Sequence, residues 1–198
     1  MSHAAFCVKS MLIAGVDEAG RGCLAGNVFA AAVILNPDFP IVGLADSKVL
    51  SAKKREFLSD QIKKQALSWS IAQASVDEID DINILQATLL AMRRAVEGLN
   101  VQPDEVLIDG NQLPKLNIPA RAIIQGDKTI QEISAASILA KVARDESMDE
   151  CAKIYPQFSF SKHKGYGTKL HCQEIEQFGI LEIHRKSFNP VRTLLFQK

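Results

Sequence analysis

The sequence predicts a mixed α/β fold in a single domain. Two apolar runs near the start of the chain are separated by a glycine-rich loop, which is typical of an antiparallel pair of strands. Further along, short apolar runs alternate with segments of helical periodicity, which is typical of a sheet flanked by helices. With 198 residues, 47% of them hydrophobic, the chain is long enough to bury a large core.

Five short apolar runs are predicted to be the strands. The first two border the glycine-rich loop, and the others lie among the predicted helices. In chain order, the predicted strands are Met11–Val16, Val28–Leu35, Trp69–Val76, Glu105–Ile108 and Ala120–Ile124.

Four segments are predicted to be helices. Ser51 is a suitable N-cap for a basic, amphipathic segment, and Thr129-x-x-Glu132 is a capping box. The second helix is indicated by apolar residues at helical spacing. The third carries the small residues Ser134–Ser137, which permit close packing on the sheet. The predicted helices are Ala52–Ala66, Ile82–Leu99, Thr129 to Asp145 or beyond, and about ten residues after Thr168.

The composition excludes several classes of protein. The formal net charge is zero, so the overall field favours no polyanionic partner, although the excess of basic residues from Lys162 onward permits a basic face. The four cysteines are scattered singly, without zinc spacing, and we expect reduced thiols. No apolar run is long enough to span a membrane, and the N-terminus lacks a signal-peptide pattern, so we expect a cytoplasmic protein.

Acidic residues follow three of the predicted strands. Asp17 and Glu18 follow the first strand, Asp109 the fourth and Asp127 the fifth. Ligands collect at strand ends in open α/β sheets, and four carboxylates gathered there could not all stay ionised without a cation. Oxygen ligands of this kind suit Mg²⁺ or Mn²⁺ that also binds a substrate phosphate. Each acid alone would more often be a turn or cap residue, but all four at strand ends favour a metal site.

The adjacency of Asp17 and Glu18 is a geometric difficulty for a shared site. Successive side chains of a regular strand point to opposite faces of the sheet. Both acids can reach one metal only if the strand ends or bends there, which Gly20 and Gly22 permit. Arg21, between these glycines, offers a planar group suited to phosphate.

The same segment also matches a relaxed dinucleotide-binding fingerprint, Gly20-x-Gly22-x-x-Ala25. That fingerprint requires a following helix whose N-terminus holds a pyrophosphate. Val28–Leu35 is predicted to be a strand instead, and the two preceding acids would repel the pyrophosphate. The fingerprint is therefore disfavoured.

Seven short motifs occur in order along nearly the whole chain. They are Gly15–Gly22, Asp46–Lys48, Ile108–Gly110, Gly126-Asp127, Ala135–Asp145, Lys164–Thr168 and His184–Phe188. This ordered set closely resembles that of bacterial ribonuclease HII. The resemblance implies a ribonuclease H-like fold, with a mixed five-stranded sheet flanked by helices and a small C-terminal helical extension. We expect residues 1–155 to form the catalytic domain and residues 156–198 to form the substrate-contacting extension packed on it.

The resemblance also implies an activity and a set of residues. It implies an endonuclease that cuts the RNA strand of RNA–DNA hybrids, and cuts 5′ of ribonucleotides embedded in duplex DNA, with Mn²⁺ or Mg²⁺. We expect two-metal-ion hydrolysis that leaves 5′-phosphate and 3′-hydroxyl ends. By motif position, the catalytic and metal-binding acids are Asp17, Glu18, Asp109 and Asp127. The expected substrate-binding residues are Gly20, Arg21, Gly22, Ser47, Lys48, Lys164, Tyr166 and Arg185.

Within this set, the resemblance assigns three kinds of contact. The Gly20–Gly22 element recognises the ribose 2′-hydroxyl, the group that distinguishes RNA from DNA. Tyr166 stacks at the junction and favours DNA on its far side, since an aromatic ring is a sequence-tolerant platform for bases. Ser47 and Lys48 contact phosphate.

The expected partner is nucleic acid, and we expect a monomer without membrane association. A module that binds the hybrid without cutting it is the alternative, but four uncompensated carboxylates would repel its phosphates. Leu194-Leu195-Phe196 could make a weak contact with a replication clamp, although docking onto its own domain is favoured. None of the histidines has a partner by spacing, and we expect none to be a metal ligand.

Overall fold

The computed structural model describes residues 11–195 of the chain. All five predicted strands are present, each within three residues of its predicted bounds. The elements, in chain order, are β1 (Ile13–Ala19), β2 (Val28–Ile34), α1 (Ala52–Gln65), β3 (Ser68–Ala74), α2 (Val76–Glu97), β4 (Glu105–Asp109), β5 (Ala120–Ile123), α3 (Gly126–Thr129), α4 (Gln131–Ile154), α5 (Phe160–His163), α6 (Lys169–Phe178) and α7 (Val191–Leu195).

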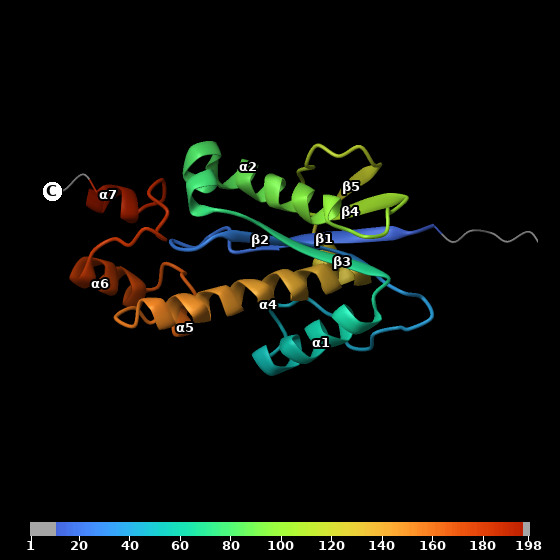
Figure 1. The fold of residues 1–198 in the computed structure, drawn as a ribbon, viewed down its shortest axis with the longest axis horizontal. Helices are drawn as coiled ribbons and strands as arrows, with labels where there is room; N and C mark the ends of the chain where they lie inside the picture. The colour runs from blue at the N-terminus through green and yellow to red at the C-terminus, as the bar shows by residue number, and fades with distance from the viewer. Residues whose placement is uncertain (1–10, 196–198) are drawn as a thin grey trace, which may run out of the picture.

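The strands form one mixed sheet in the order β3-β2-β1-β4-β5. Strand β2 is antiparallel to both of its neighbours, β3 and β1, whereas β1, β4 and β5 run parallel. Helix α2 covers one face, and α1 with the long α4 covers the other (Figure 1). This arrangement confirms the predicted mixed five-stranded sheet flanked by helices.

Small side chains let helices pack closely on both faces of the sheet. Ala30 and Ala32 belong to the core beneath α2, while Ala31 and Val33 belong to the core beneath α1 and α4. Gly15 lies directly under α4, where an added Cβ would be 2.1 Å from the carbonyl carbon of Glu132. A strand residue without a side chain is therefore required at this crossing.

Two helices begin elsewhere than predicted. Helix α2 begins at Val76, because Ser75 and Glu78 form a capping box there, and the chain kinks at Asn83. The Asn83 side chain accepts hydrogen bonds from two amides of the next turn, so the predicted start at Ile82 matches this restart only.

The capping box predicted at Thr129 is wrong. Thr129 is the last residue of α3, and α4 has Ile130 as its N-cap without a side-chain cap. The chain forms a separate turn over α3 because the Asp109 carboxylate accepts the amide of Gly126. The N-cap of α1 at Ser51 is confirmed by its contact with the amide of Lys54.

The segment after α4 packs at one end of the sheet, beyond the turn that joins β1 to β2 (Figure 1). Its apolar residues form a third cluster around Phe158 and Phe160 with Leu24 and Ala25. Isolated bridges also join Cys23 to Tyr166 and Ala25 to His184. The predicted domain boundary at residue 155 stays a prediction. Within residues 11–195, no helix is both long and apolar enough to cross a membrane.

Candidate active site

Asp17 and Asp109 lie on the same face of two neighbouring parallel strands. Val16 pairs with Ile108, and both pack in the core beneath α2. Because side chains alternate along a strand, the next residue of each strand points to the face covered by α4. Asp17, Asp109 and Asp127 each offer a carboxylate oxygen, and these oxygens lie within 4.8 Å of one another. The structure thus brings together three of the four predicted acids.

Asp127 is positioned by the turn that follows β5. Gln125 has a left-handed backbone (φ 57°), which turns the next amides back toward β4. The amides of Gly126 and Asp127 donate to Oδ1 of Asp109 at 2.7 and 3.4 Å. From α4, Ser134 Oγ donates to the carbonyl oxygen of Asp127 at 2.7 Å. The Asp109 carboxylate therefore accepts the first amides of α3 and positions Asp127.

The three aspartates fit a divalent cation. Burial raises the pKa of Asp17 well above its usual value, and the Glu18 carboxylate raises it further. Burial and then the Asp127 carboxylate raise the pKa of Asp109. A bound cation would relieve this repulsion. A donor set made only of carboxylate oxygens is the kind that Mg²⁺ and Mn²⁺ prefer.

Glu18 does not belong to the three-aspartate group. It follows Asp17 on a strand that continues to Ala19, so its Cβ lies on the opposite face of the sheet from that of Asp17. Its oxygen Oε1 lies 3.5 Å from Nη1 of Arg21. Burial raises the pKa of Glu18, Arg21 opposes the shift, and Asp109 adds to it. Glu18 is thus close enough for the Asp109 charge to raise its pKa. Its predicted role as a metal ligand stays a prediction.

Lys48 reaches the group from the loop between β2 and α1. Its Nζ lies 3.4 Å from Oδ2 of Asp127, and its side chain is 77% exposed. The Asp46 carboxylate accepts the Lys48 amide at 2.9 Å, and Ser47 Oγ lies 2.9 Å from Ser137 Oγ of α4. Ser47 is buried. The hydroxyl of Ser47 therefore anchors this loop, while Lys48 presents a cation to a ligand.

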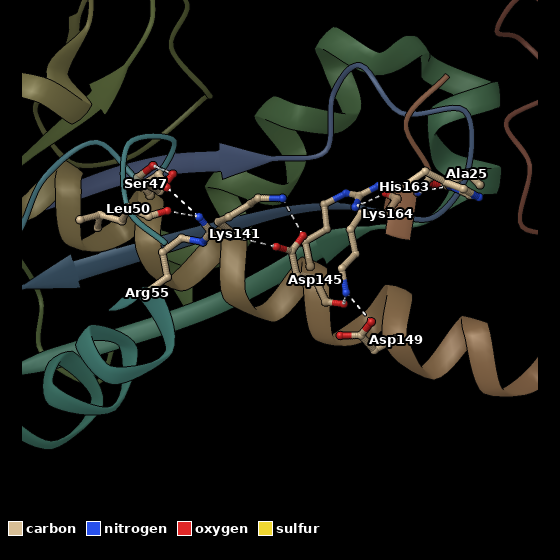
Figure 2. A network of polar contacts seen from close by, with 12 residues as sticks. Ala25, Ser47, Leu50, Arg55, Lys141, Asp145, Asp149, His163 and Lys164 are labelled. Atoms are coloured by element: carbon tan, nitrogen blue, oxygen red, sulfur yellow. Dashed lines mark hydrogen bonds and ion pairs between the residues drawn. The ribbon is translucent and has the colours of Figure 1, made fainter. Parts of the chain in front are cut away.

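Arg55 of α1 holds the same loop from behind (Figure 2). Its Nη1 donates to the carbonyl oxygens of Ser47 and Leu50 at 3.1 and 2.6 Å. Its Nη2 lies 3.7 Å from the carboxylate of Asp145, which also accepts Lys141 Nζ at 2.6 Å. Arg55 is not among the site residues predicted from the sequence. Its only sequence signal is the adjacent matching motif that ends at Lys48.

The glycine loop after β1 is supported by Arg185. This guanidinium is fully buried and donates to the carbonyl oxygens of Gly20, Arg21 and Gly26 at 2.7 to 3.0 Å. Such burial contradicts the direct substrate contact that we predicted for Arg185. The residue instead satisfies carbonyls that a loop without regular structure leaves free. A Cβ added at Gly22 would meet no atom within 4 Å, so this part of the loop is open to a ligand.

Tyr166 lies beside the glycine loop and is 41% exposed. Its main chain bridges to Cys23 of that loop, and Lys141 Nζ lies 5.6 Å from its ring centroid. Lys164, two residues earlier, donates to the carboxylate of Asp149 and to the carbonyl oxygen of Asp145 (Figure 2). Tyr166 is therefore presented to a ligand, whereas the Lys164 ammonium is already engaged on α4.

Two further interpretations are decided by the structure. Val28–Ile34 is a strand and no helix follows Gly22 before it, so the dinucleotide fingerprint lacks its required helix. Leu194 packs against the third apolar cluster, in agreement with docking onto the chain's own domain. Phe196 lies outside the described residues, and the clamp contact stays a prediction.

Three histidines have partners that spacing did not reveal. His163 Nε2 lies 2.9 Å from Oε2 of Glu174, and His171 Nε2 lies 3.1 Å from Nε2 of His184. Their rings pack against Phe158 or Phe160 of the third apolar cluster, and they are distant in sequence from the three aspartates.

The chain is similar to known proteins of one family. The ribonuclease HII family model matches residues 14–191. Ribonuclease HII of Neisseria meningitidis serogroup B is 58% identical over 189 residues, which cover 95% of this chain and 97% of that protein. Among solved structures, ribonuclease H2 from Pyrococcus horikoshii OT3 matches with a TM-score of 0.77 at 23% identity, covering 93% of this chain and 97% of that one. The PCNA:RNase HII complex from Archaeoglobus fulgidus matches with a TM-score of 0.75 at 23% identity, covering 90% and 95%. This chain belongs to the ribonuclease HII family.

Proposed function

We propose that this ribonuclease H endonuclease hydrolyses the RNA strand of RNA–DNA hybrids and cuts 5′ of ribonucleotides embedded in duplex DNA. The observation that carries the proposal is the group formed by Asp17, Asp109 and Asp127, with oxygens within 4.8 Å of one another. A group of three acids beside an exposed lysine suits metal-assisted cleavage of a phosphodiester.

In this mechanism the three aspartates, joined by Glu18, would hold Mg²⁺ or Mn²⁺. Two bound ions would activate a water and stabilise the leaving oxygen, which leaves 5′-phosphate and 3′-hydroxyl ends. Lys48, 3.4 Å from Asp127, would contact a phosphate oxygen of the substrate. Burial of Asp17 excludes water from one side of the group and strengthens its electrostatic interactions.

Selection of the sugar is assigned to the glycine loop and Tyr166. The backbone at Gly22 is open, and close approach of main-chain groups would allow hydrogen bonds to one ribose 2′-hydroxyl. Arg21, half exposed on the same loop, is suited to an adjacent phosphate. The exposed ring of Tyr166 would stack at the sugar on the other side of the junction.

The test uses a DNA duplex with one embedded ribonucleotide, an RNA–DNA hybrid and an all-DNA duplex. The proposal expects metal-dependent cuts 5′ of the ribonucleotide and within the hybrid's RNA, no cut in the all-DNA duplex, and 5′-phosphate ends. If the intact, folded protein binds these duplexes with either metal but cuts neither the embedded ribonucleotide nor the hybrid, the alternative function as a binding module is supported instead. Asp109→Asn should retain substrate binding and lose cleavage.

A further inference from the structure

The segment Leu181–Phe188 holds the glycine loop through main-chain contacts and through Arg185. The amide of Arg185 donates to the carbonyl oxygen of Leu24 at 2.8 Å, and His184 bridges to Ala25. The Arg185 side chain then binds three carbonyls of the same loop. One short segment thus supports the turn between β1 and β2 at several points.

The preceding residue, His184, is connected to Tyr166 by a chain of hydrogen bonds through His171. The Leu181 amide donates to Nδ1 of His184 at 2.9 Å, so this nitrogen accepts and the proton of the neutral ring is on Nε2. His184 Nε2 must then donate to Nε2 of His171 at 3.1 Å. His171 consequently carries its proton on Nδ1, which donates to the carbonyl oxygen of Tyr166 at 3.0 Å.

The surroundings keep both rings neutral, as this chain of hydrogen bonds requires. His171 and His184 are fully buried and pack against Phe158 and Phe160, with centroid distances of 5.4 to 6.2 Å. Burial lowers the pKa of His171 to about 4, with His163 adding to the shift, and burial followed by His171 does the same for His184. The direction of every hydrogen bond in the chain is therefore defined at neutral pH.

We propose that His171 and His184 are positioning residues that set the place of Tyr166 relative to the Gly20–Gly22 loop and thereby determine selectivity for the ribonucleotide–DNA junction. The consecutive residues His184 and Arg185 hold the two recognition elements, one through His171 and the other directly. A displacement of Tyr166 or of the Gly20–Gly22 loop changes the distance between them, and one nucleotide step of the substrate must match that distance. The inference rests on the roles proposed above for Tyr166 and the glycine loop.

Tyr166 stacks only at a junction where the sugar on the far side is that of DNA. The contribution of His171 and His184 to cleavage should therefore be larger for an embedded ribonucleotide than for a continuous RNA strand. His184→Phe keeps a ring in the buried space and removes both hydrogen bonds. We expect kcat/KM for the embedded ribonucleotide, divided by kcat/KM for the hybrid, to fall about tenfold. Tyr166→Ala should lower the same ratio, and the double variant should fall no further than Tyr166→Ala alone.

Several outcomes separate this inference from the proposed function. Unmodified protein that cuts neither substrate refutes the proposed function. Unmodified protein that cuts both, with a folded His184→Phe variant that keeps the ratio or adds its effect independently to Tyr166→Ala, overturns only the positioning role. Cys172→Ala is the matched control, because Cys172 follows His171 on α6 but makes no contact in the chain of hydrogen bonds, and it should keep the ratio.

A measurement on the unmodified protein needs no folded variant. The ¹⁵N chemical shifts of the imidazoles report which ring nitrogen carries the proton. At neutral pH we expect the proton of His171 on Nδ1 and that of His184 on Nε2. A proton on Nδ1 of His184, or a charged ring at either position, would refute the positioning chain.

Discussion

Arg144 occupies the space that a side chain at Gly20 would need. A Cβ at Gly20 would be 2.0 Å from Nε of Arg144, and the backbone there is left-handed (φ 98°). Arg144 is itself buried and donates to the carbonyl oxygens of Ala25 and Lys164 at 3.2 and 2.9 Å. The same guanidinium thus supports the glycine loop and the segment that carries Tyr166.

Gly20→Ala and Gly22→Ala should have different effects. At Gly20 the added methyl meets Arg144 in a backbone conformation that disfavours a side chain, and we expect a loss of about 1–3 kcal/mol in the free energy of unfolding. At Gly22 an added Cβ meets nothing within 4 Å, so stability should be unchanged. Urea denaturation measures both. Equal destabilisation of the two variants would contradict this account.

Gly22→Ala also tests the approach of the substrate to the main chain. If the open backbone lies against the ribose, a methyl group there should lower kcat/KM for the embedded ribonucleotide about tenfold while the protein stays as stable as before. Unchanged cleavage would remove Gly22 from the recognition surface.

Asp109→Asn should trade activity for stability. Asn keeps an oxygen that can accept the Gly126 amide but removes a charge from the repelling group, so the metal-free protein should be as stable as the unmodified one, or more stable by about 1 kcal/mol. Stabilisation by Mn²⁺ in thermal unfolding should be lost, and cleavage should fall about 100-fold or more. Asp60→Asn, an exposed acid of α1, is the control and should keep both properties.

Arg55→Lys tests the support behind Lys48. One guanidinium spans two carbonyls and Asp145, whereas an ammonium cannot present the same fork. We expect a loss of about 1–3 kcal/mol of stability and a fall in kcat, because the Ser47–Leu50 loop moves away from Asp127. Lys53→Ala changes an exposed cation of the same helix and is the comparison. If kcat is retained by Arg55→Lys, the loop does not depend on this support.

Stability should fall in acid because of the histidine pair. The pKa of each ring is about 4 in the folded protein and about 6.5 in the unfolded chain. Above pH 6.5 neither state binds a proton at these rings and no effect arises. Between pH 6.5 and 4 the unfolded chain binds more protons, so up to about 3 kcal/mol per ring is lost.

The groups that face this pair are His163 of α5 and Glu174 of α6. Urea denaturation between pH 7 and 4.5 should therefore show a shallower pH dependence for His184→Phe than for the unmodified protein. An identical slope for the two proteins would mean that the pair does not titrate in this way.

Local patterns were sufficient for most of the fold. The five apolar runs are strands and Ser51 begins α1, because period and cap chemistry act within a few residues. The capping box predicted at Thr129 does not form because of a tertiary contact: the Asp109 carboxylate accepts hydrogen bonds from the amides of the preceding turn. The acids at strand ends were predictable because parallel strands present their carboxyl ends at one edge of a sheet.

The sequence by itself determined the sheet, the family resemblance and the residues near which the chemistry lies. Only the tertiary structure decided that Glu18 lies outside the three-aspartate group, that Arg185 is buried behind the glycine loop and that His184 connects to Tyr166. Periodicity and motif spacing describe neighbours along the chain. The direction in which a buried guanidinium or imidazole donates depends on carbonyls brought to it from distant segments, and burial makes those contacts obligatory because an unpaired polar group away from water is costly.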